Sequence, residues 1–244
     1  MENQNPFPLE TRVATWNLLC QAANRLHQAI SPIVTSAFTY VDRYFTRQTS
    51  PSSSIFTVAM AALFVSIKTE AFGASAEGIV KVFLETAAGI SQEDLERVGY
   101  KYGIYSANQS NEFQQKRVLT DLATTELNLL EFLRWSFVQE YPMSQLFYIT
   151  HLLKIKAGKK YEEFKARAKE AFFQVFISES FNERDYLALA VAAIFRAVDV
   201  VGLRDFISSD WIDEYKIDVD KKKVNRLLRR FGNFELFTPD PQQQ

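Results

Sequence analysis

The sequence predicts an all-α fold made of two helical bundles in tandem, on three observations. Apolar residues recur at helical spacing through most of the 244 residues. No segment shows sustained alternation of apolar and polar residues, which would indicate a half-buried strand. Segments 55–67 and 186–198 are apolar almost all the way round, as in helices enclosed by other helices. Each is therefore expected to be the buried centre of a helical bundle.

The remaining helices are predicted from the same spacing and from the residues at which helices begin. Pro32 and Pro51 precede two of the segments, and proline is favoured at a helix start. Plausible N-caps, whose side chains can accept a hydrogen bond from the first turn, are Ser31 before Pro32, Ser52 to Ser54, Ser91 with Asp94, and Asn182 with Asp185. The segments expected to be helical are 9–28, 31–47, 53–71, 74–88, 114–136, 142–155, 160–180, 183–201 and 219–232.

A constant offset relates the two central segments and predicts an internal duplication. Alanines and phenylalanines match 131 residues apart, both in the central segments and in the helices before them. The pairs are Ala59 and Ala190, Ala61 and Ala192, Ala62 and Ala193, Phe64 and Phe195, Ala37 and Ala168, and Phe45 and Phe176. We therefore expect domains at 9–138 and 139–236. Residues 89–113 are polar, which predicts a long loop with a short helix at 91–98 inside the first domain.

The charge balance argues against nucleic acid as a partner. The chain has 28 Lys and Arg against 29 Asp and Glu, a net charge of -1. Domains that bind DNA or RNA carry a basic excess because they neutralise phosphates. Two basic clusters, 154–160 and 221–230, lie beside acidic residues or on one helix face, and we interpret them as solvated surface.

Composition also limits metal, membrane and catalytic functions. The only cysteine is Cys20, and the histidines are His27 and His151, so a Cys/His zinc site cannot be assembled. No apolar run is long enough to span a bilayer, and the polar start MENQNPFPLE does not resemble a signal peptide. No glycine-rich phosphate loop or acid–base set is visible. We expect an intracellular protein that is not an enzyme and has no cofactor, metal or membrane partner.

Three charged residues stand on apolar helix faces, where a charge is costly unless it is paired or reaches solvent. Asp42 lies among aromatic residues, and Arg12 is the natural partner for a structural ion pair. Glu126 falls on an apolar stripe, whose edge reaching solvent would be a sufficient explanation. Lys68 follows the first central segment, where the negative end of the helix dipole alone favours a lysine. The stripe consists of Leu119, Leu122, Ala123, Leu130 and Leu133.

Three motifs in the first predicted domain resemble the cyclin box. AALFVSIKTEA resembles its signature of alanines, Leu-Phe and then Ser-x-Lys-x-Glu, and TYVDRYF resembles the Tyr-Ile-Asp-Arg-Phe stretch of the preceding helix. TTELNLLEFLRWSF resembles the fifth cyclin-box helix. The resemblance covers roughly residues 9–235, and the first box carries nearly all of the specific match. It implies two tandem cyclin-box folds, each a five-helix bundle around a buried central helix.

The resemblance implies a non-catalytic protein that binds and activates a cyclin-dependent protein kinase as a heterodimer. By resemblance, Lys68 and Glu126 form the cluster that grips the regulatory helix of the kinase. Leu130 and Trp135 match apolar positions that pack on the same kinase helix. Asp199 stands in the second box where the first has Lys68, so the gripping site is expected once.

The subtype is indicated by two further stretches. The insertion before SNEFQQKRVLTDLATTE and the segment WIDEYKIDVD resemble transcription-associated cyclins of the T, K and C types, which implies a nuclear protein. The stretch SESFNERD departs from the Leu-Cys-Leu-x-Tyr-x-Pro run of that subtype. A cell-cycle or Pho80-like cyclin, a DNA-binding cyclin-fold transcription factor like factor IIB, and a helical scaffold without a kinase remain alternatives.

Overall fold

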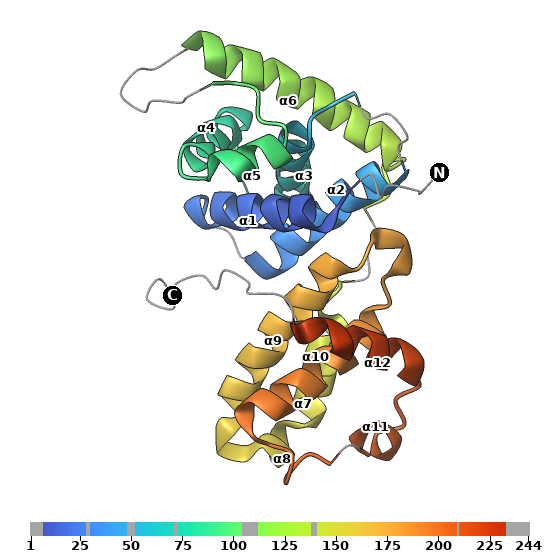
Figure 1. Cartoon of the computed structure of the whole chain (residues 1–244). Helices are drawn as coiled ribbons and strands as arrows, with labels where there is room; N and C mark the ends of the chain where they lie inside the picture. Colours follow the sequence, from blue (N-terminus) through green and yellow to red (C-terminus); the bar gives the residue numbers. More distant parts are fainter. Residues whose placement is uncertain are drawn as a thin grey trace. The chain divides into compact units, whose positions relative to one another are not determined.

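The computed structural model describes residues 7–27, 30–47, 52–70, 73–103, 112–137, 141–208 and 210–232. These residues form helices and connecting segments, with no strand among them (Figure 1), which confirms the all-α prediction. The chain divides into two compact units. The first comprises Met1–Gln139 and Ser180–Asn182, and the second comprises Glu140–Glu179 and Glu183–Gln244. The main division lies next to the boundary expected between 138 and 139. None of the helices in the described ranges is long and apolar enough to cross a membrane.

The first unit is built around α3. Every side chain from Phe56 to Ile67 on this helix is buried, and α3 contacts α1, α2, α4 and α6. Its elements are α1 (Leu9–Arg25), the π-helical turn η1 (Ile30–Val34), α2 (Thr35–Arg47), α3 (Ile55–Thr69), α4 (Ala76–Ala87), α5 (Gln92–Arg97) and α6 (Glu112–Phe132). The all-round apolar character of segment 55–67 thus follows from contacts on every side.

The second unit has its own central helix, α10, which contacts α7, α9 and α12. The side chains from Ala188 to Ile194 are buried there. The elements of this part of the chain are α7 (Ser144–Leu152), α8 (Lys154–Ala157), η2 (Gly158–Lys160), α9 (Tyr161–Ser178), η3 (Phe181–Glu183), α10 (Tyr186–Val201), α11 (Trp211–Glu214), α12 (Lys221–Leu228) and η4 (Arg229–Gly232). The first two residues of η3 belong to the first unit. Each unit therefore buries one apolar helix among others.

Helix boundaries in the two units keep the offset found in the sequence. Ile55 and Tyr186 begin α3 and α10 and are 131 residues apart, and Arg47 and Ser178 end α2 and α9 at the same spacing. The aligned alanines of both central helices are fully buried. Small buried side chains allow neighbouring helices to approach closely, so the matching alanines have the same packing role in both units.

Three of the predicted caps are present, while several boundaries differ from expectation. Ser54, Ser91 and Asp185 each accept a hydrogen bond from the backbone N–H three residues later. The segment expected at 142–155 is broken into α7 and α8, and α11 was not expected at all. Both α8 and α11 are single turns, too short to show a helical period in the sequence.

The segment expected as a long loop, 89–113, contains α5 and an aromatic contact with α3. Tyr100 and Tyr102 lie with their ring centroids 4.9 and 5.9 Å from that of Phe56, the second residue of α3. The short helix expected at 91–98 corresponds to α5. The expectation for residues 104–111 lies outside the described residues.

Candidate functional site

Lys68 and Glu126 form an ion pair at the surface of the first unit. The Lys68 Nζ atom donates a hydrogen bond to Glu126 Oε1 at 2.6 Å, and the two side chains are 50% and 17% exposed. Lys68 lies in the last turn of α3, where a cation also interacts favourably with the helix dipole. Glu126 comes from the middle of α6, which packs along α3. Residues 58 positions apart in sequence therefore meet on one surface.

The buried face of α6 differs from the predicted stripe. Thr125 is buried and Ala123 is exposed, whereas the stripe had included Ala123 and left Thr125 out. The buried residues of the helix are Gln114, Val118, Leu122, Thr125 and Leu129. Glu126 therefore lies beside the buried face, at its edge, where Lys68 pairs with its carboxylate. Alanine is a weak guide to burial, since it is tolerated on either face of a helix.

Apolar side chains are exposed on the same helix as Glu126 and just beyond it. Leu130 is half-buried in α6, and Trp135, after the helix end, is 60% exposed. The Trp135 N–H donates to the Leu130 carbonyl at 3.0 Å, which connects these two predicted contact residues. Leu127 is 51% exposed and was missed by the sequence analysis, although it directly follows Glu126.

The chain leaves α6 through two residues in left-handed backbone conformation. Arg134 and Trp135 have φ values of 53° and 55°, a conformation that costs a residue with a Cβ atom about 1 kcal/mol or more. The Arg134 N–H donates to the Glu131 carbonyl at 2.9 Å. This turn ends the helix and leaves the Trp135 indole largely in solvent, beyond the last turn of α6.

Arg12 and Asp42 form a buried ion pair between α1 and α2. Two guanidinium nitrogens of Arg12 donate to the two carboxylate oxygens of Asp42, at 2.8 and 3.2 Å, and the side chains are 2% and 0% exposed. The guanidinium group also lies over the rings of Phe7 and Phe38, and Thr46 Oγ1 donates to Asp42. With no exposed surface to offer a ligand, this pair joins two helices and forms no binding site.

The second unit has a different arrangement at the position that matches Lys68. Asp199 lies there, in the last turn of α10, and accepts a hydrogen bond from Arg204 Nε at 2.5 Å. Another exposed lysine–glutamate pair, Lys156 with Glu214, joins α8 to α11. This pair has the same sequence separation as Lys68 and Glu126, and it provides a matched control for experiments on the first unit.

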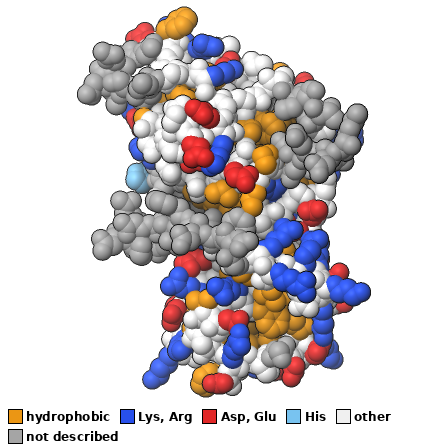
Figure 2. Space-filling view, in the orientation of Figure 1, with side chains coloured by type: hydrophobic (Ala, Val, Ile, Leu, Met, Phe, Trp, Pro, Cys, Tyr) orange, Lys and Arg blue, Asp and Glu red, His pale blue; other side chains and the backbone are white. Residues whose placement is uncertain are grey.

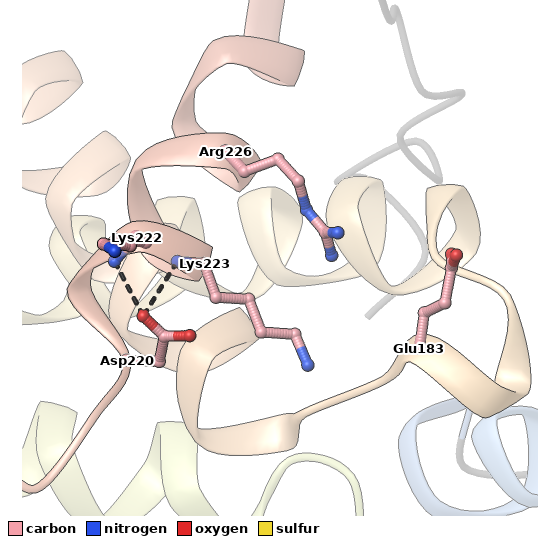
Figure 3. Close-up of a pocket in the computed structure, with 5 residues that line it drawn as sticks. All are labelled: Glu183, Asp220, Lys222, Lys223 and Arg226. Carbon is pink, nitrogen blue, oxygen red and sulfur yellow. Dashed lines mark hydrogen bonds between the residues drawn. The ribbon is translucent and has the colours of Figure 1, made fainter.

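A polar pocket of about 410 Å³ lies at the start of α12 in the second unit (Figure 3). Lys223 and Arg226 extend into it from α12, and Glu183 stands on the opposite side (Figure 3). Asp220 caps α12 by accepting hydrogen bonds from two backbone N–H groups. The lining residues are Glu183, Asp220, Lys222, Lys223 and Arg226. Cations and carboxylates therefore share the pocket, and neither charge dominates it.

Carboxylates also accompany the basic cluster at 221–230. Lys221 pairs with Asp213 at 3.0 Å and Lys223 with Asp185 at 3.7 Å, while the buried Glu179 pairs with both Arg226 and Arg230. Lys and Arg side chains are interspersed with Asp and Glu over the visible face of this unit, in the lower half of Figure 2. Phosphate binding requires a net excess of cations, and these pairs reduce that excess.

The chain was compared with protein-family models and with curated proteins, and neither comparison gives a match. Within the part of the chain that the structure describes, no group of three or more His, Cys, Asp or Glu side chains could hold a metal ion. The Lys68–Glu126 surface is therefore the candidate functional site.

Proposed function

We propose that this chain is a cyclin-type regulatory subunit that binds a cyclin-dependent protein kinase and activates it without supplying a catalytic group. The observation that carries the proposal is the Lys68–Glu126 ion pair, 2.6 Å long, at a surface where α3 meets α6. Exposed Leu127 and Trp135 belong to the same helix and the turn after it. Aromatic and aliphatic side chains around a few polar groups are typical of protein–protein interfaces.

The pair is suited to hold the backbone of a partner helix. An ammonium group has three N–H donors, and the hydrogen bond that Lys68 makes with the described residues is directed at Glu126. Its remaining donors can reach partner carbonyls, and the second Glu126 oxygen can accept from partner N–H groups. Because Lys68 is half exposed, it can make these contacts without leaving Glu126.

The expected mechanism is a shift in the conformation of the kinase. A protein kinase positions ATP productively when its β3 lysine pairs with the glutamate of its αC helix. A partner that binds the inward position of αC better than the outward one shifts the kinase toward its active state. The chain would contribute this binding energy over an interface of roughly 2,000 Å² or more, as in permanent complexes.

The two-unit organisation supports a single kinase site within this proposal. Matching helix boundaries and buried alanines in both units fit a duplicated cyclin box. Asp199 replaces lysine at the equivalent position of the second unit and pairs with the nearby Arg204. The reversed charge would oppose the contacts proposed for Lys68. By resemblance of 89–113 and 211–220, we further propose a transcription-associated kinase as the partner and the nucleus as the location.

A binding assay with a panel of purified cyclin-dependent kinases tests the proposal. We expect one kinase to bind the chain and gain activity, and Lys68→Ala with Glu126→Ala to lower its affinity by about tenfold or more. The control, Lys156→Ala with Glu214→Ala, removes an equivalent pair from the second unit and should leave affinity unchanged. Failure of the folded wild-type chain to bind any kinase, or equal effects of both double variants, would contradict the proposal.

A further inference from the structure

The Lys68 ammonium group contacts an aromatic ring as well as Glu126. Its Nζ atom lies 4.0 Å from the centroid of the Phe64 ring, one helical turn earlier on α3. The ring is 5% exposed, so it is a fixed part of the core with one face available to the lysine. A cation within about 6 Å of a ring centroid is attracted by the negative face of the ring. Lys68 is therefore held from two sides, by a ring and by a carboxylate.

We propose that Phe64 is a positioning residue, which holds the Lys68 ammonium group against Glu126 in the orientation that a partner meets. A long lysine side chain loses considerable rotamer entropy when it is fixed, and an exposed ion pair alone contributes little to offset this loss. The buried ring supplies a second attraction on the same helix, at spacing i, i+4, where side chains are neighbours. This inference deepens the proposed kinase-binding function and rests on it for its biological meaning.

Comparison with the second unit distinguishes a positioning role of Phe64 from a role in packing alone. Phe195 occupies the position that matches Phe64, but its ring lies 5.4 Å from that of Trp211, centroid to centroid, and Asp199 stands where a lysine would be. A phenylalanine at this position thus packs in both units, while it contacts a cation in the first. Phe195→Leu is therefore a control that removes the same ring from an equivalent helix without touching a lysine.

Nuclear magnetic resonance of the labelled chain tests the contact directly. Because the ring shields protons above its face, we expect the ε-methylene protons of Lys68 to resonate upfield of those of the exposed lysines. Phe64→Leu should abolish this shift, whereas Phe64→Tyr, which keeps the ring, and Phe195→Leu should preserve it. A Lys68 signal that is the same in the wild type and in Phe64→Leu would overturn the inference, whether or not a kinase binds.

A double-mutant cycle tests the consequence for binding. We expect Phe64→Leu to weaken binding of the kinase identified above by about three- to thirtyfold, the range for exposed to desolvated cation–π contacts. In a Lys68→Ala chain, Phe64→Leu should cause no further loss, because the ring acts through the lysine. Equal losses in both backgrounds would show that Phe64 acts by packing alone and would overturn the inference. If the wild type binds no kinase, the proposed function fails, while the resonance experiment still decides the contact.

Discussion

Two carboxylates next to apolar helix faces are accommodated in opposite ways. Asp42 is completely buried and receives two hydrogen bonds from an equally buried Arg12. Glu126 lies at the edge of its buried face and pairs with a lysine that is half in solvent. Removing one partner of a buried pair leaves an uncompensated charge, which costs about 3–5 kcal/mol. Removing one partner of an exposed pair costs about 1 kcal/mol or less.

This contrast predicts different effects on stability. Asp42→Asn should lower the free energy of unfolding by about 3 kcal/mol or more, because the Arg12 guanidinium would stay buried without its counter-charge. Lys68→Ala should lower it by about 2 kcal/mol at most, because it removes an exposed ion pair and the contact with the Phe64 ring. Urea denaturation of the purified variants measures both values. Comparable losses would mean that Lys68 has a structural role, and the effect of Lys68→Ala on binding would then need another explanation.

The sequence predicts these residues to different extents. The Arg12–Asp42 pair follows from a general rule, since a carboxylate among aromatic residues needs a cation nearby. The meeting of Lys68 with Glu126 does not follow from spacing, because the two helices are far apart in sequence; the resemblance suggested it. The exposure of Trp135 depends on a left-handed turn that has no glycine to signal it. The contact of Lys68 with Phe64 depends on a side-chain orientation that no pattern encodes.

At the scale of secondary structure, helix starts are more predictable than helix ends. Starts carry a chemical signal, and Ser54, Ser91 and Asp185 cap the helices that follow them. Ends at His27 and Lys216 use left-handed residues other than glycine, so the sequence lacks the usual marker. The helix expected from residue 31 begins as α2 only at Thr35, after the π-helical turn η1, which contains Pro32. Proline has no N–H to donate, and its preference for helix starts predicts the earlier boundary.

The cap of α10 gives a prediction at this scale. The Asp185 carboxylate accepts a hydrogen bond from the Ala188 N–H at 3.1 Å, and the helix it starts is the centre of the second unit. Asp185→Ala should lower the free energy of unfolding by about 1 kcal/mol, the usual effect of losing an N-cap. Asp185→Asn keeps an oxygen acceptor and should retain most of that stability. Thermal unfolding followed by far-ultraviolet circular dichroism compares the two variants. A loss as large for Asn as for Ala would assign the effect to the carboxylate charge beside Lys223.

At the scale of the whole molecule, the duplication is visible in sequence because packing restricts the central helices most. Ala59, Ala61 and Ala62 and their matches in α10 are fully buried, and a larger side chain at these places would overpack the core. Surface positions carry no such restriction, so Lys68 and Asp199 differ in charge at matching places. The buried helices predict two bundles, and the chain divides into two compact units. The short elements α8 and α11 carry no comparable pattern in the sequence.

Two separate cores predict that a local change destabilises the unit that contains it. Trp16 is buried in the first unit and Trp211 in the second, while Trp135 is largely exposed. Chains with Trp135→Phe and one other tryptophan replaced by phenylalanine therefore report on one core each. Asp42→Asn should lower the denaturation midpoint seen by Trp16 fluorescence and leave that of Trp211 unchanged, and Asp185→Ala should do the reverse. A common shift of both midpoints with either variant would instead show that the two units unfold as one cooperative body.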